Sequence, residues 1–239
     1  GDSGSTTLKV DGLPECNVLD VKYDSVVDLK MADKTVKADI GFVDKIAKND
    51  DYTLTVSLQN PSDKPAPGTY EGTITVSFTI KEYEARIGDE YYVTLEDAID
   101  AANDGDTIDI LKDINGNIDS TSKIGFTINN KSVTLNGNNH TVTLNGGFNN
   151  DTYGIYVGGD VANTVKINSL NINAIGVERA IRSEGSVNVS IDNCKITTNG
   201  VGINVKGSND FTISNSDLVV NVKDNEAFTY HKRSAVLVS

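Results

Sequence analysis

The chain is poor in the residues that build most catalytic and metal centres. Its 239 residues include no tryptophan, one methionine, two cysteines and two histidines. Cys16 and Cys194 fall in what the patterns below predict to be different domains, so no disulfide is expected between them. Neither cysteine has a second cysteine or a histidine at metal-binding spacing. We therefore predict no metal and no cofactor, and the two histidines exclude most histidine-dependent mechanisms.

Positive charge is also scarce. Lysine and arginine total 21 against 34 aspartate and glutamate residues, which gives a net charge of −13 and a pI near 4.5. Binding to nucleic acid or to anionic lipid needs a basic surface, so we predict neither. No apolar run approaches the ~18 residues of a membrane-spanning helix. The polar start GDSGSTT is typical of a mature or trimmed terminus, and we expect an extracellular or cell-surface location.

What the chain does have is β-forming and turn-forming residues. Threonine, valine, isoleucine and tyrosine favour strands, while asparagine, glycine and aspartate favour turns. In residues 1–82, apolar and polar residues alternate in several short runs, such as DYTLTVSL and GTITVSFTI. In the second run, four apolar residues predict one half-buried face: Ile74, Val76, Phe78 and Ile80. Proline and glycine mark the loop NPSDKPAPG between these runs, so residues 1–82 are predicted to form a β-sandwich.

One segment of this first domain supports a more specific interpretation. PAPGTYEGTITVSFTI resembles the closing strand of Ig-like or pilin-like sandwich modules of bacterial surface proteins. The resemblance covers about sixteen residues and implies a bacterial surface protein.

Residues 83–104 predict a hairpin followed by a short helix. Gly88 and Asp89 separate two short strand-like pieces and indicate a tight turn. Thr94 is a suitable N-cap for a helix whose apolar stripe is formed by Leu95, Ala98, Ile99 and Ala102. The run TLEDAIDAANDGDTIDIL resembles the amphipathic N-terminal cap helix of pectin-lyase-like β-helix proteins. That resemblance implies that a parallel β-helix begins directly after it.

Internal repeats in residues 105–239 predict the same architecture. Four segments align, starting at Val133, Val165, Val189 and Phe211, and their starts lie 32, 24 and 22 residues apart. A second set aligns on another face, with IYV, IRS, INV and VLV starting at Ile155, Ile181, Ile203 and Val236. The spacing fits a right-handed parallel β-helix with coils of about 22 residues, which parallel crossovers favour. Longer intervals between successive aligned segments predict loops at 145–153 and 219–234. The alignment turns Cys194 inward, where we expect a small buried residue.

Two groups of residues are candidates for binding. The first is Glu178, Arg179, Arg182 and Glu184, whose alternating charge favours a solvated, salt-bridged surface and leaves a sugar- or uronate-binding patch as the alternative. The second is the basic and aromatic cluster of Tyr230, His231, Lys232 and Arg233 on the longest predicted loop. We expect a ligand, if there is one, at this second group first.

Other polar residues are better explained by structure. The Asn-Thr-Asp, Asp-Asp and Gly-His-Gly motifs of β-helix hydrolases are missing from the predicted β-helix, residues 105–239. Asp192 and Asp217 occupy different ladder positions in adjacent coils, and His140 fits a turn. Three further carboxylates lack the ligand spacing of a calcium loop, namely Asp104, Asp106 and Asp109.

Two functional hypotheses remain open. The first is a non-catalytic, adhesin-like surface protein whose β-helix binds a polysaccharide or a host or cell-surface glycoprotein. The second is a polysaccharide lyase or glycoside hydrolase, which the family resemblance brings with it. Charged side chains of adjacent coils that converge in one groove would favour the enzyme.

Overall fold

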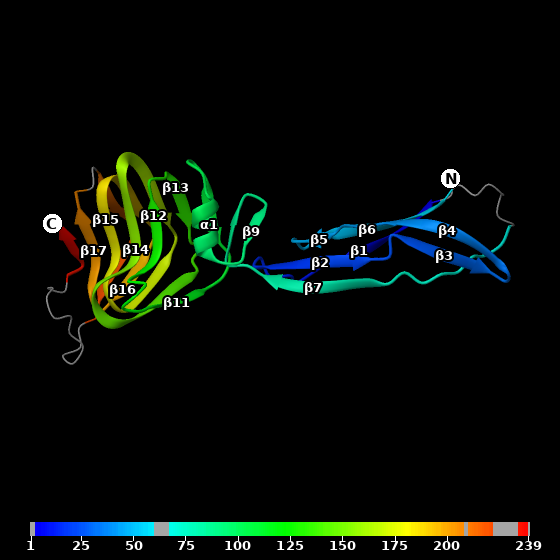
Figure 1. The fold of residues 1–239 in the computed structure, drawn as a ribbon, viewed down its shortest axis with the longest axis horizontal. Helices are drawn as coiled ribbons and strands as arrows, with labels where there is room; N and C mark the ends of the chain where they lie inside the picture. Colours follow the sequence, from blue (N-terminus) through cyan, green and yellow to red (C-terminus); the bar gives the residue numbers. More distant parts are fainter. Residues whose placement is uncertain (1–2, 60–66, 208–209, 222–233, 239) are drawn as a thin grey trace. The chain divides into compact units, whose positions relative to one another are not determined.

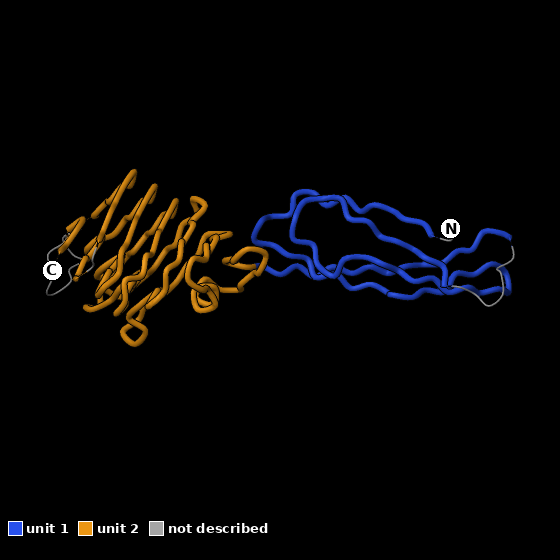
Figure 2. Tube along the Cα trace, turned by 90° about the horizontal axis from the view of Figure 1, so that it is seen from above, with its two compact units in different colours: residues 1–82 blue, residues 83–239 orange. Residues whose placement is uncertain are grey.

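In a computed structural model, the chain divides between Glu82 and Tyr83 into two compact units (Figure 2). Residues 3–59, 67–207, 210–221 and 234–238 are described. The fold is all-β, with one short helix among the described residues.

Unit 1, residues 1–82, contains two antiparallel sheets (Figure 1). The four-stranded sheet has the order β1–β6–β4–β3, with the strands β1 (Ser3–Lys9), β6 (Asp51–Leu58), β4 (Lys34–Gly41) and β3 (Val26–Met31). The three-stranded sheet has the order β5–β2–β7, with the strands β5 (Lys45–Ile46), β2 (Asn17–Tyr23) and β7 (Val76–Glu82). Strand β3 was not among the sequence predictions, and most of the predicted loop NPSDKPAPG lies outside the described residues.

The predicted apolar face of residues 74–80 is buried only in its first half. Ile74 and Val76 pack against a small cluster that includes Ala38 and Ile40. The prediction is wrong for Phe78, which is 44% exposed, and for Ile80, which is 65% exposed. Strand β7 pairs only with β2 in the described part of the chain, so no neighbouring strand on its other side helps to cover these side chains.

Unit 2 begins with a hairpin and a helix. Strands β8 (Ala85–Ile87) and β9 (Glu90–Tyr92) pair antiparallel, and β10 (Thr107–Ile110) pairs with the other edge of β8. Helix α1 (Leu95–Ala101) comes between β9 and β10 along the chain. Thr94 is its N-cap, as predicted, and the hydroxyl of Thr94 accepts a hydrogen bond from the amide of Asp97 at 3.1 Å. The apolar stripe of the helix is buried in the same core as the strands that follow.

The rest of unit 2 is a β-solenoid of about four turns, consistent with the predicted parallel β-helix (Figure 1). Its strands are β11 (Ile114–Ile118), β12 (Ile124–Asn129), β13 (Val133–Asn136), β14 (Thr141–Asn168), β15 (Asn171–Asp192), β16 (Lys195–Thr198), β17 (Val201–Lys206), β18 (Phe211–Ser214), β19 (Asp217–Val220) and β20 (Val236–Val238). Each pairs in parallel with the strand one coil away.

Strands β14 and β15 run along more than one face of the solenoid. Irregularities in their pairing between Asn145 and Asn149 and between Asn149 and Tyr153 mark the turns from one face to the next. The predicted loop at 145–153 is therefore wrong, because this segment lies within strand β14, with pairing to β15 at Asn145, Asn149 and Tyr153. Of the predicted loop at 219–234, residues 219–220 belong to β19 and residues 222–233 lie outside the described residues.

The inward-facing columns follow the predicted repeat register. Ile155, Ile181 and Ile203 form one column, and each is at most 1% exposed. Cys194 is buried, as predicted, and burial raises the pKa of its thiol. At the turn just before it, Ser169 and Asn193 adopt left-handed backbone conformations in adjacent coils, and the side chains hydrogen-bond at 2.9 Å.

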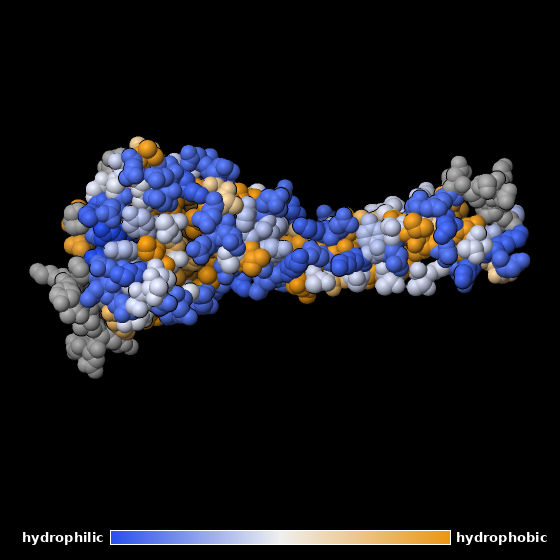
Figure 3. All heavy atoms as spheres, viewed as in Figure 1, coloured by the Kyte–Doolittle hydropathy of each residue, from blue (hydrophilic) through white to orange (hydrophobic). Residues whose placement is uncertain are grey.

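Outward positions of the solenoid carry mostly polar side chains, and hydrophilic residues cover much of the face seen in Figure 3. Lys166 and Ser190, for example, lie side by side on adjacent coils. Within the described residues, no helix is long and apolar enough to cross a membrane.

Candidate functional site

An outward column of the solenoid brings Tyr156, Arg182 and Asn204 together on three successive coils. Tyr156 on β14 lies opposite Arg182 on β15, which lies opposite Asn204 on β17. The inward residues of the same strands fix this column, because side chains alternate between the two faces of each strand. Tyr153 and Arg179 form a second pair on the same two strands.

Arg182 is held in one orientation by two acceptors. Its Nε and Nη2 donate to Oε2 of Glu184 at 3.0 and 2.8 Å, and its Nη1 donates to Oδ1 of Asn204 at 2.8 Å. The other carboxylate oxygen of Glu184 accepts from Lys206 Nζ at 2.8 Å. Hydrogen bonds from Lys206 and then Arg182 hold the pKa of Glu184 below its ordinary value. The guanidinium is thus a rigid, ion-paired group.

A second ion pair lies at the neighbouring corner of the solenoid and is fully enclosed. Arg179 Nη1 donates to Glu178 Oε2 at 3.0 Å, and the side chains are 6% and 0% exposed. The same carboxylate oxygen accepts from the amide of Asp151. The amide of Glu178 donates to the hydroxyl of Thr152, which is also buried. Buried charges require this kind of pairing, since their desolvation is otherwise costly.

The ring of Tyr153 covers both guanidinium groups. The ring centroid of Tyr153 lies 5.3 Å from Cζ of Arg179 and 5.1 Å from Cζ of Arg182, which is cation–π range. The rings of Tyr153 and Tyr156 are 6.2 Å apart. Desolvation and then the charge of Glu184 raise the pKa of Tyr156, so its hydroxyl stays protonated at neutral pH. Both tyrosines remain partly exposed.

The structure brings two of the predicted site residues together, and the other four lie outside the described residues. Arg179 and Arg182 lie together under Tyr153, but the expectation of a solvated surface is wrong for both, since they are 5% and 8% exposed. Packing by the coils on either side explains the burial, and it is invisible in the charge pattern. The other predicted residues, Tyr230, His231, Lys232 and Arg233, lie outside the described residues.

Sequence reasoning missed Tyr153 and Tyr156 as site residues. A signal for Tyr156 was present in the repeat alignment, which sets IYV at 155–157 against IRS at 181–183. That alignment already puts Tyr156 beside Arg182. Tyr153 follows a pairing irregularity, and its position over the two arginines depends on how β14 turns there.

The remaining polar candidates are engaged in local structure. Asp192 accepts from Ser214 at 2.7 Å and from Asn215 at 2.8 Å, and these bonds lower its pKa. Asp217 lies opposite Lys195 in a different column. His140 Nδ1 is 3.4 Å from a carboxylate oxygen of Asp113.

The three carboxylates near the end of α1 bind different partners. Asp104 accepts from the amide of Ser132, Asp106 from the amide of Asn103, and Asp109 from Arg86 and Asn136. Across the described part of the chain, no group of three or more histidine, cysteine, aspartate or glutamate side chains is placed to hold a metal ion.

Comparisons with models of known protein families, with curated proteins and with solved structures find no match for this chain.

Proposed function

We propose that this chain is a non-catalytic, extracellular, adhesin-like surface protein whose solenoid binds a glycan or a glycoprotein through the face around Tyr156. Its solenoid would be a right-handed β-helix of the pectin-lyase-like kind, with α1 as its cap. Two features support that assignment: the apolar side of α1 is buried in the first coil, and a solenoid needs its open end covered. The two sheets of unit 1 would form an Ig-like or pilin-like sandwich.

The observation that carries the proposal is the tyrosine pair over a buried arginine network. Tyr153 and Tyr156 offer partly exposed aromatic rings; Tyr153 lies against both ion-paired arginines, and the ring of Tyr156 lies beside that of Tyr153. Aromatic rings with a polar edge suit binding partners that have both apolar faces and hydroxyl groups, which describes sugars. A rigid site of this kind also loses little conformational entropy on binding.

The state of the two arginines argues for binding over catalysis. A lyase needs a base beside an acidic sugar, and a hydrolase needs two carboxylates on either side of the scissile bond. Arg182 already donates three N–H groups to Glu184 and Asn204, and Arg179 is paired with Glu178. Neither is presented as a free cation, so we favour a neutral glycan over an acidic one.

A glycan array followed by calorimetric titration tests the proposal. Tyr156→Ala removes the ring and should weaken the best glycan about tenfold, which corresponds to ~1.4 kcal/mol. Tyr156→Phe keeps the ring and should retain binding within about threefold. Lys166→Ala, on an outward column elsewhere, is the control and should change nothing. Equal binding by Tyr156→Ala and the unaltered protein would refute this site.

The enzyme alternative has its own readout. The protein would be incubated with neutral and acidic polysaccharides, with and without calcium, while reducing ends and the absorbance of unsaturated products are followed. We expect no turnover. Turnover abolished by a change at Arg179 or Arg182 would replace the binding proposal with a catalytic one.

A further inference from the structure

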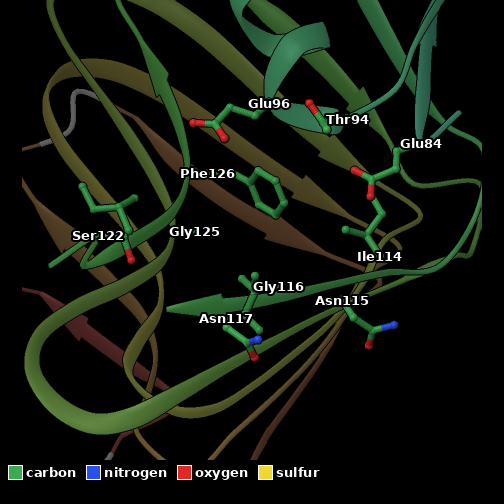
Figure 4. A pocket seen from close by; sticks show the side chains of 12 residues that line it. Glu84, Thr94, Glu96, Ile114, Asn115, Gly116, Asn117, Ser122, Gly125 and Phe126 are labelled. Atoms are coloured by element: carbon green, nitrogen blue, oxygen red, sulfur yellow. The ribbon is translucent and has the colours of Figure 1, made fainter. Parts of the chain in front are cut away.

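A second site lies at the start of the solenoid. A cavity of about 310 Å³ opens between the first turn of α1 and strands β11 and β12 (Figure 4). Its apolar lining includes Ile114, Phe126 and Leu144, and the phenylalanine ring lies near the centre of the close-up. The volume is at the lower end of the ~300–1,000 Å³ range of small-molecule pockets.

A missing side chain explains the space. Gly116 occupies the inward column that continues through Leu144, Ala174 and Thr198 in the following coils. The first coil therefore has no side chain where the second has a leucine. A Cβ atom built on Gly116 would lie 3.0 Å from Cδ2 of Leu144, so this methyl group closely borders the space and would have to shift slightly for a side chain at Gly116.

The charged residues of the cavity lining are both acidic. Among the described residues, Glu84 and Glu96 are the charged ones that line it, and no described lysine, arginine or histidine does. Figure 4 shows Glu96 and Thr94 above the phenylalanine ring, and the carboxylate of Glu84 beside the ring, on the other side of it from Glu96. One oxygen of Glu84 accepts the amide of Leu95 at 2.9 Å, and Thr94 accepts the amide of Asp97. The amides of Leu95 and Asp97 at the start of the helix thus already have acceptors within the chain.

From this arrangement we infer that the cavity binds a primary amine carried on a short aliphatic stem. The stem replaces the side chain that Gly116 lacks and covers Phe126 and Leu144. The ammonium group then lies at the rim beside Glu84 and Glu96, where carboxylates favour a cation. A free alkylamine and a lysine side chain both have this chemistry. The site uses none of the residues of the Tyr156 face, so each proposal stands or fails separately.

Saturation-transfer NMR on the full chain tests the inference with matched probes. Pentylamine, pentan-1-ol and pentanoate have stems of the same length and differ in charge. We expect pentylamine to bind at about millimolar affinity and at least about tenfold tighter than pentanoate. Nα-acetyl-lysine methylamide forms the second arm, and its affinity relative to pentylamine tells a lysine side chain from a free amine. No binding by either amine, or equal binding of pentanoate, would overturn the inference.

Two variants test the negative charge at the cavity rim and the free space inside the cavity separately. Glu96→Gln should weaken pentylamine about threefold or more and leave pentan-1-ol unchanged, while Asp97→Asn removes an equal charge from the same turn outside the cavity lining and should have no effect. Gly116→Leu should fill the vacancy and abolish binding of amine and alcohol alike. If Gly116→Leu does not fold, the comparison of Glu96→Gln with Asp97→Asn tests the inference by itself. Amine affinity that Glu96→Gln leaves unchanged would contradict the inference.

Discussion

Strand β7 of unit 1 and strand β15 of unit 2 carry the same alternation of apolar and polar residues, yet their apolar sides have different environments. Ile181 and Ile191 on β15 are completely buried, whereas Phe78 and Ile80 on β7 are 44% and 65% exposed. Strand β15 has a coil on each side, so Ile181 and Ile191 have pairing residues in both adjacent coils. Alternation thus predicts which side chains share a face, and neighbouring strands decide whether that face is covered.

Charged residues show the same contrast. The Lys37–Asp28 pair of unit 1 joins two side chains that are 61% and 50% exposed, at 3.2 Å. The Arg179–Glu178 pair of unit 2 has a similar length and almost no exposure. Exposed pairs contribute little to stability, while removing one partner of a buried pair leaves an uncompensated charge.

The largest expected effect comes from breaking the buried pair. Glu178→Gln keeps the shape of the side chain and removes its charge, so Arg179 stays buried and loses its buried carboxylate partner, while the exposed carboxylate of Asp151 remains 3.8 Å from its Nη1. The free energy of unfolding of unit 2 should fall by about 3–5 kcal/mol. Asp28→Asn does the same to the exposed pair of unit 1 and should cost less than about 1 kcal/mol. Urea denaturation of both variants, with hydrogen exchange to assign each loss to its unit, measures the difference.

A similar loss for the two variants would show that burial does not distinguish these pairs. It would also weaken the proposal that the buried arginine network supports Tyr153 at the binding face.

The apolar columns provide the next comparison. Ile181→Ala removes a side chain between Ile155 and Ile203 and should lower the stability of unit 2 by about 2–5 kcal/mol, since a buried cavity remains. Ile80→Ala in β7 should cost less than about 1 kcal/mol, because the side chain is already largely in water. Amide exchange of β15 and β7 reports each change locally. Strong destabilisation by Ile80→Ala would mean that β7 is covered in solution.

The smallest expected effect concerns pH. The folded state lowers the pKa of Glu184 from 4.5, chiefly through its hydrogen bond from Lys206 and then that from Arg182. Glu184 therefore contributes stability that is complete above its unfolded pKa and is lost as the pH falls through its folded pKa. Below pH 4.5, the unaltered protein should lose stability faster than Glu184→Gln. The effect is modest because the carboxylate is one-third exposed.

A matched measurement extends this comparison to unit 1. The hydrogen bond from Lys81 lowers the pKa of Asp20. Asp20→Asn should therefore make the stability of unit 1 fall less steeply as the pH decreases, as Glu184→Gln does for unit 2. Thermal unfolding between pH 3 and pH 6 checks both variants. If the unfolding temperature of each variant falls with decreasing pH as steeply as that of the unaltered protein, these carboxylates are not the titrating groups.

Much of unit 2 was predictable from its sequence. The repeat alignment placed Ile155, Ile181 and Ile203 in one column, because a coil of nearly constant length brings equivalent residues into register. The alternation set their side chains inward, and Thr94 marked the start of α1. The same local signals predicted most strands of unit 1.

The tertiary structure decided what covers these elements. It buried Arg179 and Arg182, left Ile80 in water, placed Tyr153 over both arginines and opened a cavity where Gly116 has no side chain. None of this follows from periodicity, which describes one strand at a time. Exposure, pairing and cavities depend on neighbours that are distant in the chain, and only the folded arrangement of coils and sheets brings them together.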